Sequence, residues 1–121
     1  MRRVLSLLSV VFISSVPAFA QTATPSNRFA LDQAAPDLAT AQAYTFRMYA
    51  DGATTGTVVV MTCTGSSSPF VCSTPVNAFT PGAHAITMTA ANVAGESTAS
   101  AALSFVMIIQ PAPPTNLRIV Q

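Results

Sequence analysis

Charge is what this sequence has least of. None of its 121 residues is a lysine, and five arginines stand against four carboxylates, which gives a formal net charge of +1. Binding to nucleic acid or to an anionic membrane surface depends on clustered cations that displace counterions from phosphates. No such cluster occurs along the chain, so we expect neither kind of partner. Solubility must come from serine, threonine, asparagine and glutamine.

Residues that carry out catalysis or hold metals are also scarce. Histidine occurs once, as His84, and the four carboxylates are scattered along the chain. The Gly-x-Ser-x-Gly elbow that would support a Ser-His-Asp triad is missing. Calcium would need several oxygen ligands in one loop, and no Asp-x-Asp run exists. We therefore expect no catalytic residue, no metal and no cofactor, and we assign His84 a structural role.

No apolar run is long enough to cross a bilayer, which takes about 20 residues. A shorter run, Val4 to Val16, opens the chain after Arg2 and Arg3 and before the small-x-small site Ala18-Phe19-Ala20. This three-part layout is typical of a secretory signal. We predict a signal peptide over residues 1–20, no membrane span after its cleavage, and a secreted protein that is either extracellular or periplasmic. The remaining 121 − 20 = 101 residues suffice for one domain.

The two cysteines, Cys63 and Cys72, are predicted to form a disulfide. Export places them in an oxidising compartment, where such a bond persists. The intervening TGSSSPFV segment contains a loop at residues 65–69, which would allow the two cysteines to lie on adjacent antiparallel strands. A redox or metal-binding pair would need closer spacing or further ligands.

Alternation with a period of two predicts β-strands over most of the chain. The longest such stretch is PGAHAITMTAANVAGES, in which His84, Ile86 and Met88 share one face. Between the first two strands, Asp37 is predicted to cap one helical turn. The predicted strands cover residues 28–32, 43–50, 57–63, 70–74, 84–92 and 98–109.

These strands predict a single all-β domain over residues 28–109. Strands that bury one face must stack against a second sheet, which indicates a β-sandwich. Residues 21–27 are predicted to be a flexible leader or a short edge strand. Residues 110–121 form a proline-rich tail.

Three segments resemble the fibronectin type III modules of the immunoglobulin-like sandwiches, in their bacterial secreted form. They are FALDQAAP, AYTFRMYADG and TPGAHAITMTAANVAGESTAS. The resemblance implies an immunoglobulin-like β-sandwich of about six to seven antiparallel strands. It also implies a structural corner at His84, Asn92 and Gly95. Here His84 stands where the family has a tyrosine that bonds to backbone, and an imidazole nitrogen can make the same bond.

Modules of this family act mostly as spacers, adhesive modules or accessory binding domains. The resemblance therefore implies a structural or adhesive function, without catalysis, through contacts with an unknown protein or carbohydrate at the cell surface. The alternative is a small accessory domain that binds carbohydrate or protein through loop aromatics. Tyr49 and Phe70 are the candidates for such a contact surface, because each adjoins a predicted loop.

The tail carries a short apolar segment, Leu117 to Val120, after three prolines. The sequence PPTNLRIV resembles the opening of another such module. Three interpretations stay open: the remnant of a second module, a segment that docks on its own sheet edge, and a strand exchanged with a neighbouring molecule.

Overall fold

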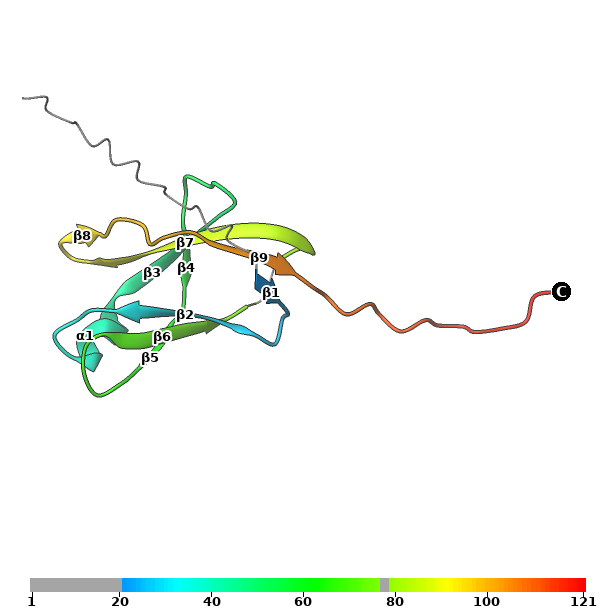
Figure 1. The fold of residues 1–121 in the computed structure, drawn as a ribbon, viewed down its shortest axis with the longest axis horizontal. Coiled ribbons are helices and arrows are strands. Elements are labelled where there is room, and N and C mark those ends of the chain that lie inside the picture. Colours follow the sequence, from blue (N-terminus) through cyan, green and yellow to red (C-terminus); the bar gives the residue numbers. More distant parts are fainter. Residues whose placement is uncertain (1–20, 77–78) are drawn as a thin grey trace, which may run out of the picture.

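The chain folds into two β-sheets that pack against each other, with one short helix beside the smaller sheet (Figure 1). The computed structural model describes residues 21–76 and 79–121, and the predicted signal peptide lies outside them. The elements in chain order are β1 (Gln21–Ala23), β2 (Arg28–Gln33), α1 (Leu38–Ala43), β3 (Thr45–Ala50), β4 (Thr57–Val59), β5 (Thr62–Thr64), β6 (Phe70–Pro75), β7 (Gly82–Asn92), β8 (Gly95–Glu96) and β9 (Leu103–Met107). The all-β prediction is confirmed.

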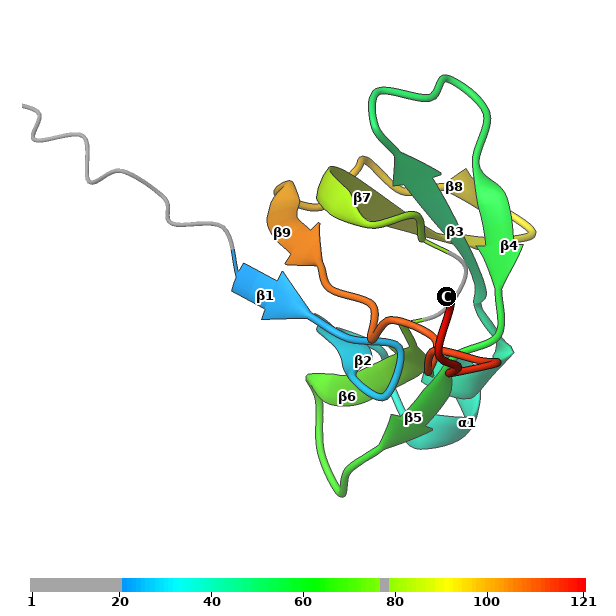
Figure 2. The ribbon, with the colours of Figure 1, turned by 90° about the vertical axis from the view of Figure 1, so that its right-hand side faces the viewer.

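The larger sheet has the strand order β1-β9-β7-β3-β4, with β8 paired to β7, and the smaller sheet has the order β2-β6-β5 (Figure 2). All pairs are antiparallel except β1 with β9, which are parallel. The antiparallel pairing predicted for residues 28–109 is confirmed, and the segment before it contributes β1 as a short edge strand. After β1, a turn closed by the hydrogen bond from Thr24 N to Asn27 Oδ1 (2.8 Å) reverses the chain. The chain then enters β2 in the other sheet.

The predicted strand over residues 57–63 is wrong, because this segment changes sheets. It forms β4 in the larger sheet and β5 in the smaller one. Gln42 bonds to the backbone on both sides of the point where the chain enters β5. Its Nε2 donates to Met61 O (2.7 Å), and its Oε1 accepts from Cys63 N (2.8 Å). Backbone groups that have left a sheet need such partners when they are buried.

The last strand is shorter than the predicted 98–109, since β9 covers only Leu103–Met107. Before β9, two serine side chains take the place of backbone acceptors in the pairing with β7. The Oγ atoms of Ser97 and Ser100 accept hydrogen bonds from Ala90 N and Met88 N, both at 3.0 Å. Side-chain oxygens that occupy strand donors compete with backbone pairing. The segment therefore follows β7 without becoming a strand.

The helix α1 begins as the sequence predicts. Asp37 is its N-cap, and its Oδ1 accepts a hydrogen bond from Thr40 N at 2.7 Å. That bond lowers the pKa of Asp37, because it favours the charged carboxylate. The short helix orients Gln42 toward the sheet crossing.

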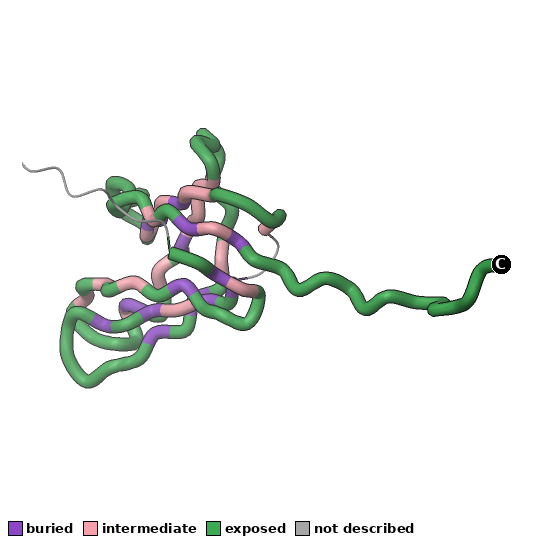
Figure 3. The backbone as a smooth tube through the Cα atoms, turned by 45° about the vertical axis from the view of Figure 1, so that its right-hand side comes forward, coloured by how far each residue is buried: buried purple, intermediate pink, exposed green. Residues whose placement is uncertain are grey.

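The core lies between the sheets, and buried residues alternate with exposed ones along the strands (Figure 3). An aromatic cluster fills one end of it. Phe105 of β9 is 2% exposed and contacts Phe29 and Phe79 edge to face, at centroid distances of 5.3 and 5.1 Å. Edge-to-face aromatic pairs stabilise a folded protein by more than the burial of their apolar area alone.

The predicted disulfide is confirmed. Cys63 of β5 and Cys72 of β6 lie directly opposite each other in the antiparallel register and are bonded. Cys72 is fully buried. The bond ties the edge strand of the smaller sheet to its central strand.

The tail, residues 110–121, contains no strand and is exposed at every residue. It runs from the end of β9 away from the domain (Figure 1). Over residues 21–76 and 79–121, no helix has the length and apolar character needed to span a membrane.

Candidate functional site

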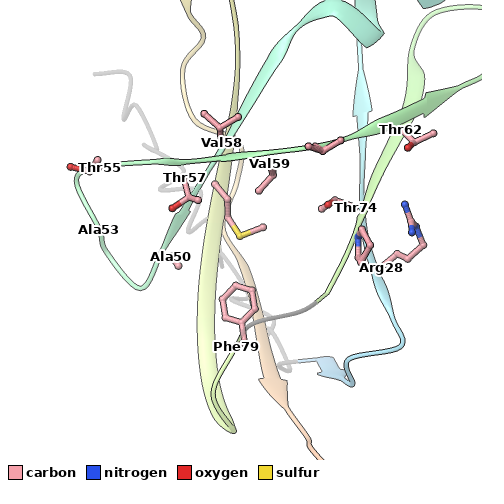
Figure 4. A pocket seen from close by; sticks show the side chains of 13 residues that line it. Arg28, Ala50, Ala53, Thr55, Thr57, Val58, Val59, Thr62, Thr74 and Phe79 are labelled. Carbon is pink, nitrogen blue, oxygen red and sulfur yellow. The ribbon is translucent and has the colours of Figure 1, made fainter.

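A groove of about 770 Å³ opens between the two sheets, on the side where the chain changes sheets. Figure 4 shows it between β4 and the end of β6, with Phe79 at one end and Arg28 at the other. Its walls are mostly aliphatic or aromatic, and Arg28 is the one charged residue among the described residues that line it. The Arg28 side chain is oriented by a hydrogen bond from its Nε to Ser73 Oγ (3.2 Å).

The sheet crossing explains why this groove exists. Because β4 ends at Val59 and β5 begins at Thr62, the larger sheet stops before it covers the smaller one. Val59 and Val58 point to opposite sides of the strand, and Val59 points into the groove (Figure 4). Val60, which follows β4 and lines the groove, is 86% exposed. The rim of the groove is apolar at this point.

The strand β4 forms one edge of the larger sheet. In the described part of the chain it pairs with β3 alone, so its other side has backbone groups that no strand satisfies. Natural edge strands are usually protected by lysine, proline or inward charges. The segment TVVV at residues 57–60 has none of these. An apolar groove beside such an edge can accept an extended peptide, whose backbone adds to the sheet while one side chain enters the groove.

A second polar site surrounds His84 near the start of β7. Its Nδ1 lies 2.7 Å from Asp51 Oδ2, and its Nε2 lies 2.7 Å from the carbonyl oxygen of Thr80. Asp51 Oδ1 in turn accepts from Ala85 N (2.9 Å). The imidazole stacks on Phe105, and its side chain is 12% exposed. His84 therefore ties a turn of β3 to the corner before β7.

The Asp51 carboxylate and the Thr80 carbonyl are acceptors, and the Thr80 hydroxyl, which can donate or accept, lies 3.3 Å from Nε2. The two acceptors favour a protonated imidazole. The hydrogen bond to Asp51, followed by the one to Thr80 O, raises the pKa of His84. The same bond to His84, followed by the one from Ala85 N, lowers the pKa of Asp51. The bond between the two side chains therefore favours the charged form of each.

We predict that the free energy of unfolding falls at alkaline pH through His84. Because its pKa is raised above the ordinary 6.5, its stabilisation is complete below about pH 6.5 and is lost as the pH rises through the raised value. The contribution of Asp51 to the free energy of unfolding is present above pH 3.8, its ordinary pKa, and is lost as the pH falls through its lowered pKa. Urea unfolding of the chain and of Asp51→Asn between pH 5 and about 9 measures this.

The alkaline side of the profile is diagnostic, because His84 is the only histidine in the chain. The Asp51→Asn variant removes the charge pair and should flatten that side. Equal alkaline losses in the chain and in Asp51→Asn would contradict the assignment.

The structure places the other predicted corner residues at the opposite end of β7 from His84. Asn92 Oδ1 accepts from Ala94 N (2.9 Å), which closes an Asx turn before β8. Gly95 follows with φ +131, a backbone conformation that side chains disfavour. Sequence reasoning missed Asp51 as the partner of His84. Its signal was the Asp-Gly turn, which places that carboxylate at the end of a strand.

The two aromatic candidates do not lie together. Phe70 faces the core from β6 and is 3% exposed. Tyr49 lies on the outer face of β3, and its hydroxyl donates to Glu96 Oε1, which also accepts from Thr89. The bond to Glu96 raises the pKa of Tyr49. Of the two rings, only Tyr49 is available at the surface, and it is already fixed by neighbours.

The Glu96 carboxylate is held by these two hydroxyls. The hydrogen bond from Thr89 and then the one from Tyr49 lower its pKa. Gly56 packs against the Tyr49 ring so closely that an added Cβ would lie 2.7 Å from Cζ. The cluster fixes β8 and the β3–β4 loop over the outer face of the larger sheet.

The fold and the two sites define an all-β domain of two sheets with one disulfide. Compared with known proteins, the chain matches no family model, no curated protein and no solved structure.

Proposed function

We propose that this chain is a secreted immunoglobulin-like module without catalytic activity, which acts in adhesion or surface assembly by binding an extended protein segment. The observation that carries the proposal is the apolar groove beside the unprotected edge of β4. The strand orders β9-β7-β3-β4 and β2-β6-β5 support the immunoglobulin-like assignment, because the chain passes back and forth between two antiparallel sheets as in that family. The disulfide fits an oxidising compartment.

The chemistry of the groove favours a peptide over a polar ligand. Met48, Val59 and Phe79 line it, and none of them is exposed by more than an intermediate amount. Arg28 at one end can bond to a carbonyl or carboxylate of the ligand. The edge of β4 can supply backbone hydrogen bonds along the same direction. Together they suit a short strand with alternating apolar side chains.

The absence of catalysis is supported by the state of His84. Both of its nitrogens are occupied, by Asp51 and by Thr80 O, so neither is available to move a proton for a substrate. In the described residues, no three His, Cys, Asp or Glu side chains gather to hold a metal ion. The described lining of the groove contains no titratable group besides Arg28.

Selection from a displayed peptide library against the purified chain tests the proposal. We expect enrichment of extended peptides with apolar residues at alternate positions. Val60→Asp should weaken their binding by about tenfold or more, because it places a charge on the apolar rim of the groove. The matched control is Val93→Asp, since Val93 is also exposed but lies in the turn between β7 and β8.

Two results would contradict the proposal. One is peptide binding that Val60→Asp leaves unchanged. The other is binding to glycans on an array that is lost in Tyr49→Ala and kept in Val60→Asp. That second result would favour the accessory carbohydrate-binding domain, for which Tyr49 is the remaining surface aromatic.

A further inference from the structure

The strand β2 offers a second open edge, longer than that of β4. It covers Arg28–Gln33 and pairs along its whole length with β6 on one side. On its other side, no strand pairs with it in the described part of the chain. Six residues of backbone can therefore accept one more strand.

The inner side of this edge is incompletely covered, and both apolar and polar residues surround it. Phe29 and Leu31 face inward from β2, and Leu31 is only half-buried. A hollow of about 160 Å³ adjoins it, with Phe46 and Met88 among its lining residues. An added strand could place an aliphatic side chain there. The outward residues of β2 include Asp32, an exposed carboxylate.

The tail has the pattern of a strand that fits this edge. Leu117, Ile119 and Val120 are 99%, 89% and 78% exposed, which is costly for aliphatic side chains left in water. Leu117 and Ile119 alternate with Arg118, the one cation of the tail. Prolines at 111, 113 and 114 keep the preceding segment extended. In the described residues, neither Arg118 nor Asp32 takes part in a salt bridge.

The direction in which the tail would run along β2 distinguishes pairing with its own domain from pairing with a second copy. The hydrogen bond from Ile108 N to Ala23 O places the end of β9 at the end of the domain where β2 begins. From there the tail points away from its own domain (Figure 1). If it folded back, it would run parallel to β2. A tail that arrives at the Gln33 end from another copy would run antiparallel, which is the more stable pairing.

We propose that residues 117–120 of one copy add as an antiparallel strand to β2 of a second copy. In the register that opposes Arg118 to Asp32, Ile119 lies opposite Leu31 and both face the hollow. Opposite charges directly across two strands stabilise the pair and fix its register. The donor and acceptor surfaces differ, so the assembly is head to tail and can extend into chains. This inference does not depend on the groove at β4.

Reversing the charge of Arg118 or of Asp32 tests the proposed register. The chain, exported from a bacterial host and purified, is measured by sedimentation over a range of concentrations. We expect dimers and longer chains, with association weakened about tenfold by Arg118→Asp and by Asp32→Arg, since each variant places like charges opposite each other. A mixture of the two variants should associate again, as alternating assemblies with 1:1 composition, because each tail then meets an oppositely charged β2 edge on the other variant.

Gln110→Glu is the matched control, since it adds a negative charge to the tail outside the paired segment, and its association should equal that of the parent chain. A monomeric parent chain at every concentration would overturn the proposal. So would association that Arg118→Asp leaves unchanged, or a mixture of the two variants in which association is not restored. A tail that is protected from proteolysis in a monomer would show docking on its own domain instead.

Discussion

The Phe105→Ala variant is expected to lose about 3–5 kcal/mol of unfolding free energy, the cost typical of a buried phenylalanine truncated in a packed core. Phe105 is among the most buried large side chains of the described residues, at 2% exposure. It contacts Phe29 from β2, Phe79 from the corner before β7, and the His84 ring. One side chain thus joins both sheets and the charged pair at Asp51. Its removal leaves a cavity that none of these fixed rings can fill.

Urea unfolding followed by circular dichroism measures this loss. The control is Val93→Ala, which removes apolar atoms from a fully exposed site and should change the unfolding free energy by less than about 0.5 kcal/mol. A Phe105→Ala loss below about 1 kcal/mol would contradict the assignment of this ring to the centre of the core.

The second large effect is expected from removing the disulfide. The Cys63→Ala, Cys72→Ala double variant should lose about 2–3 kcal/mol, because the unfolded chain regains the freedom that the small ring had removed. The bond also ties β5, an edge strand of three residues, to β6. A domain of this size has little core to offset that loss.

The experiment compares urea midpoints of the chain with and without a reducing agent, and of the double variant under both conditions. The chain should approach the double variant when reduced, while the double variant should not respond to the reductant. Equal midpoints for the oxidised and reduced chain would contradict a stabilising role for the bond.

Loss of the disulfide should affect the two proposed binding edges, β4 and β2, differently. The edge strand β4 ends at Val59, just before the sheet crossing where Gln42 bonds to Cys63 N. Loss of the disulfide frees β5 at that point and should weaken peptide binding in the groove. The edge of β2 is held by β6 over six residue pairs and does not adjoin β5.

Much of this fold follows from local patterns that the sequence contains. Alternation of apolar and polar residues predicts β7, because successive side chains of a β-strand point to opposite faces of the sheet. Asp37 and Thr40 define the helix start through one hydrogen bond within four residues. The disulfide could be predicted from two cysteines, a short loop between them and the predicted export of the chain.

Other features depend on contacts between residues far apart in the chain, and the sequence could not indicate them. The run at residues 57–63 looks like one strand, and only the Gln42 side chain, some twenty residues earlier, explains its change of sheet. The strand before β9 is interrupted because Ser97 and Ser100 bond to β7. Phe70 adjoins a loop, yet the register of β6 turns its ring into the core.

Residue types and short-range spacing were enough to predict the all-β class and the disulfide. The folded structure was needed to identify Asp51 as the partner of His84, to locate the groove and to show which strand edges remain unpaired in the described residues. Those features arise where two sheets meet or fail to cover each other. Such coverage depends on the relative placement of whole strands, which no local pattern encodes.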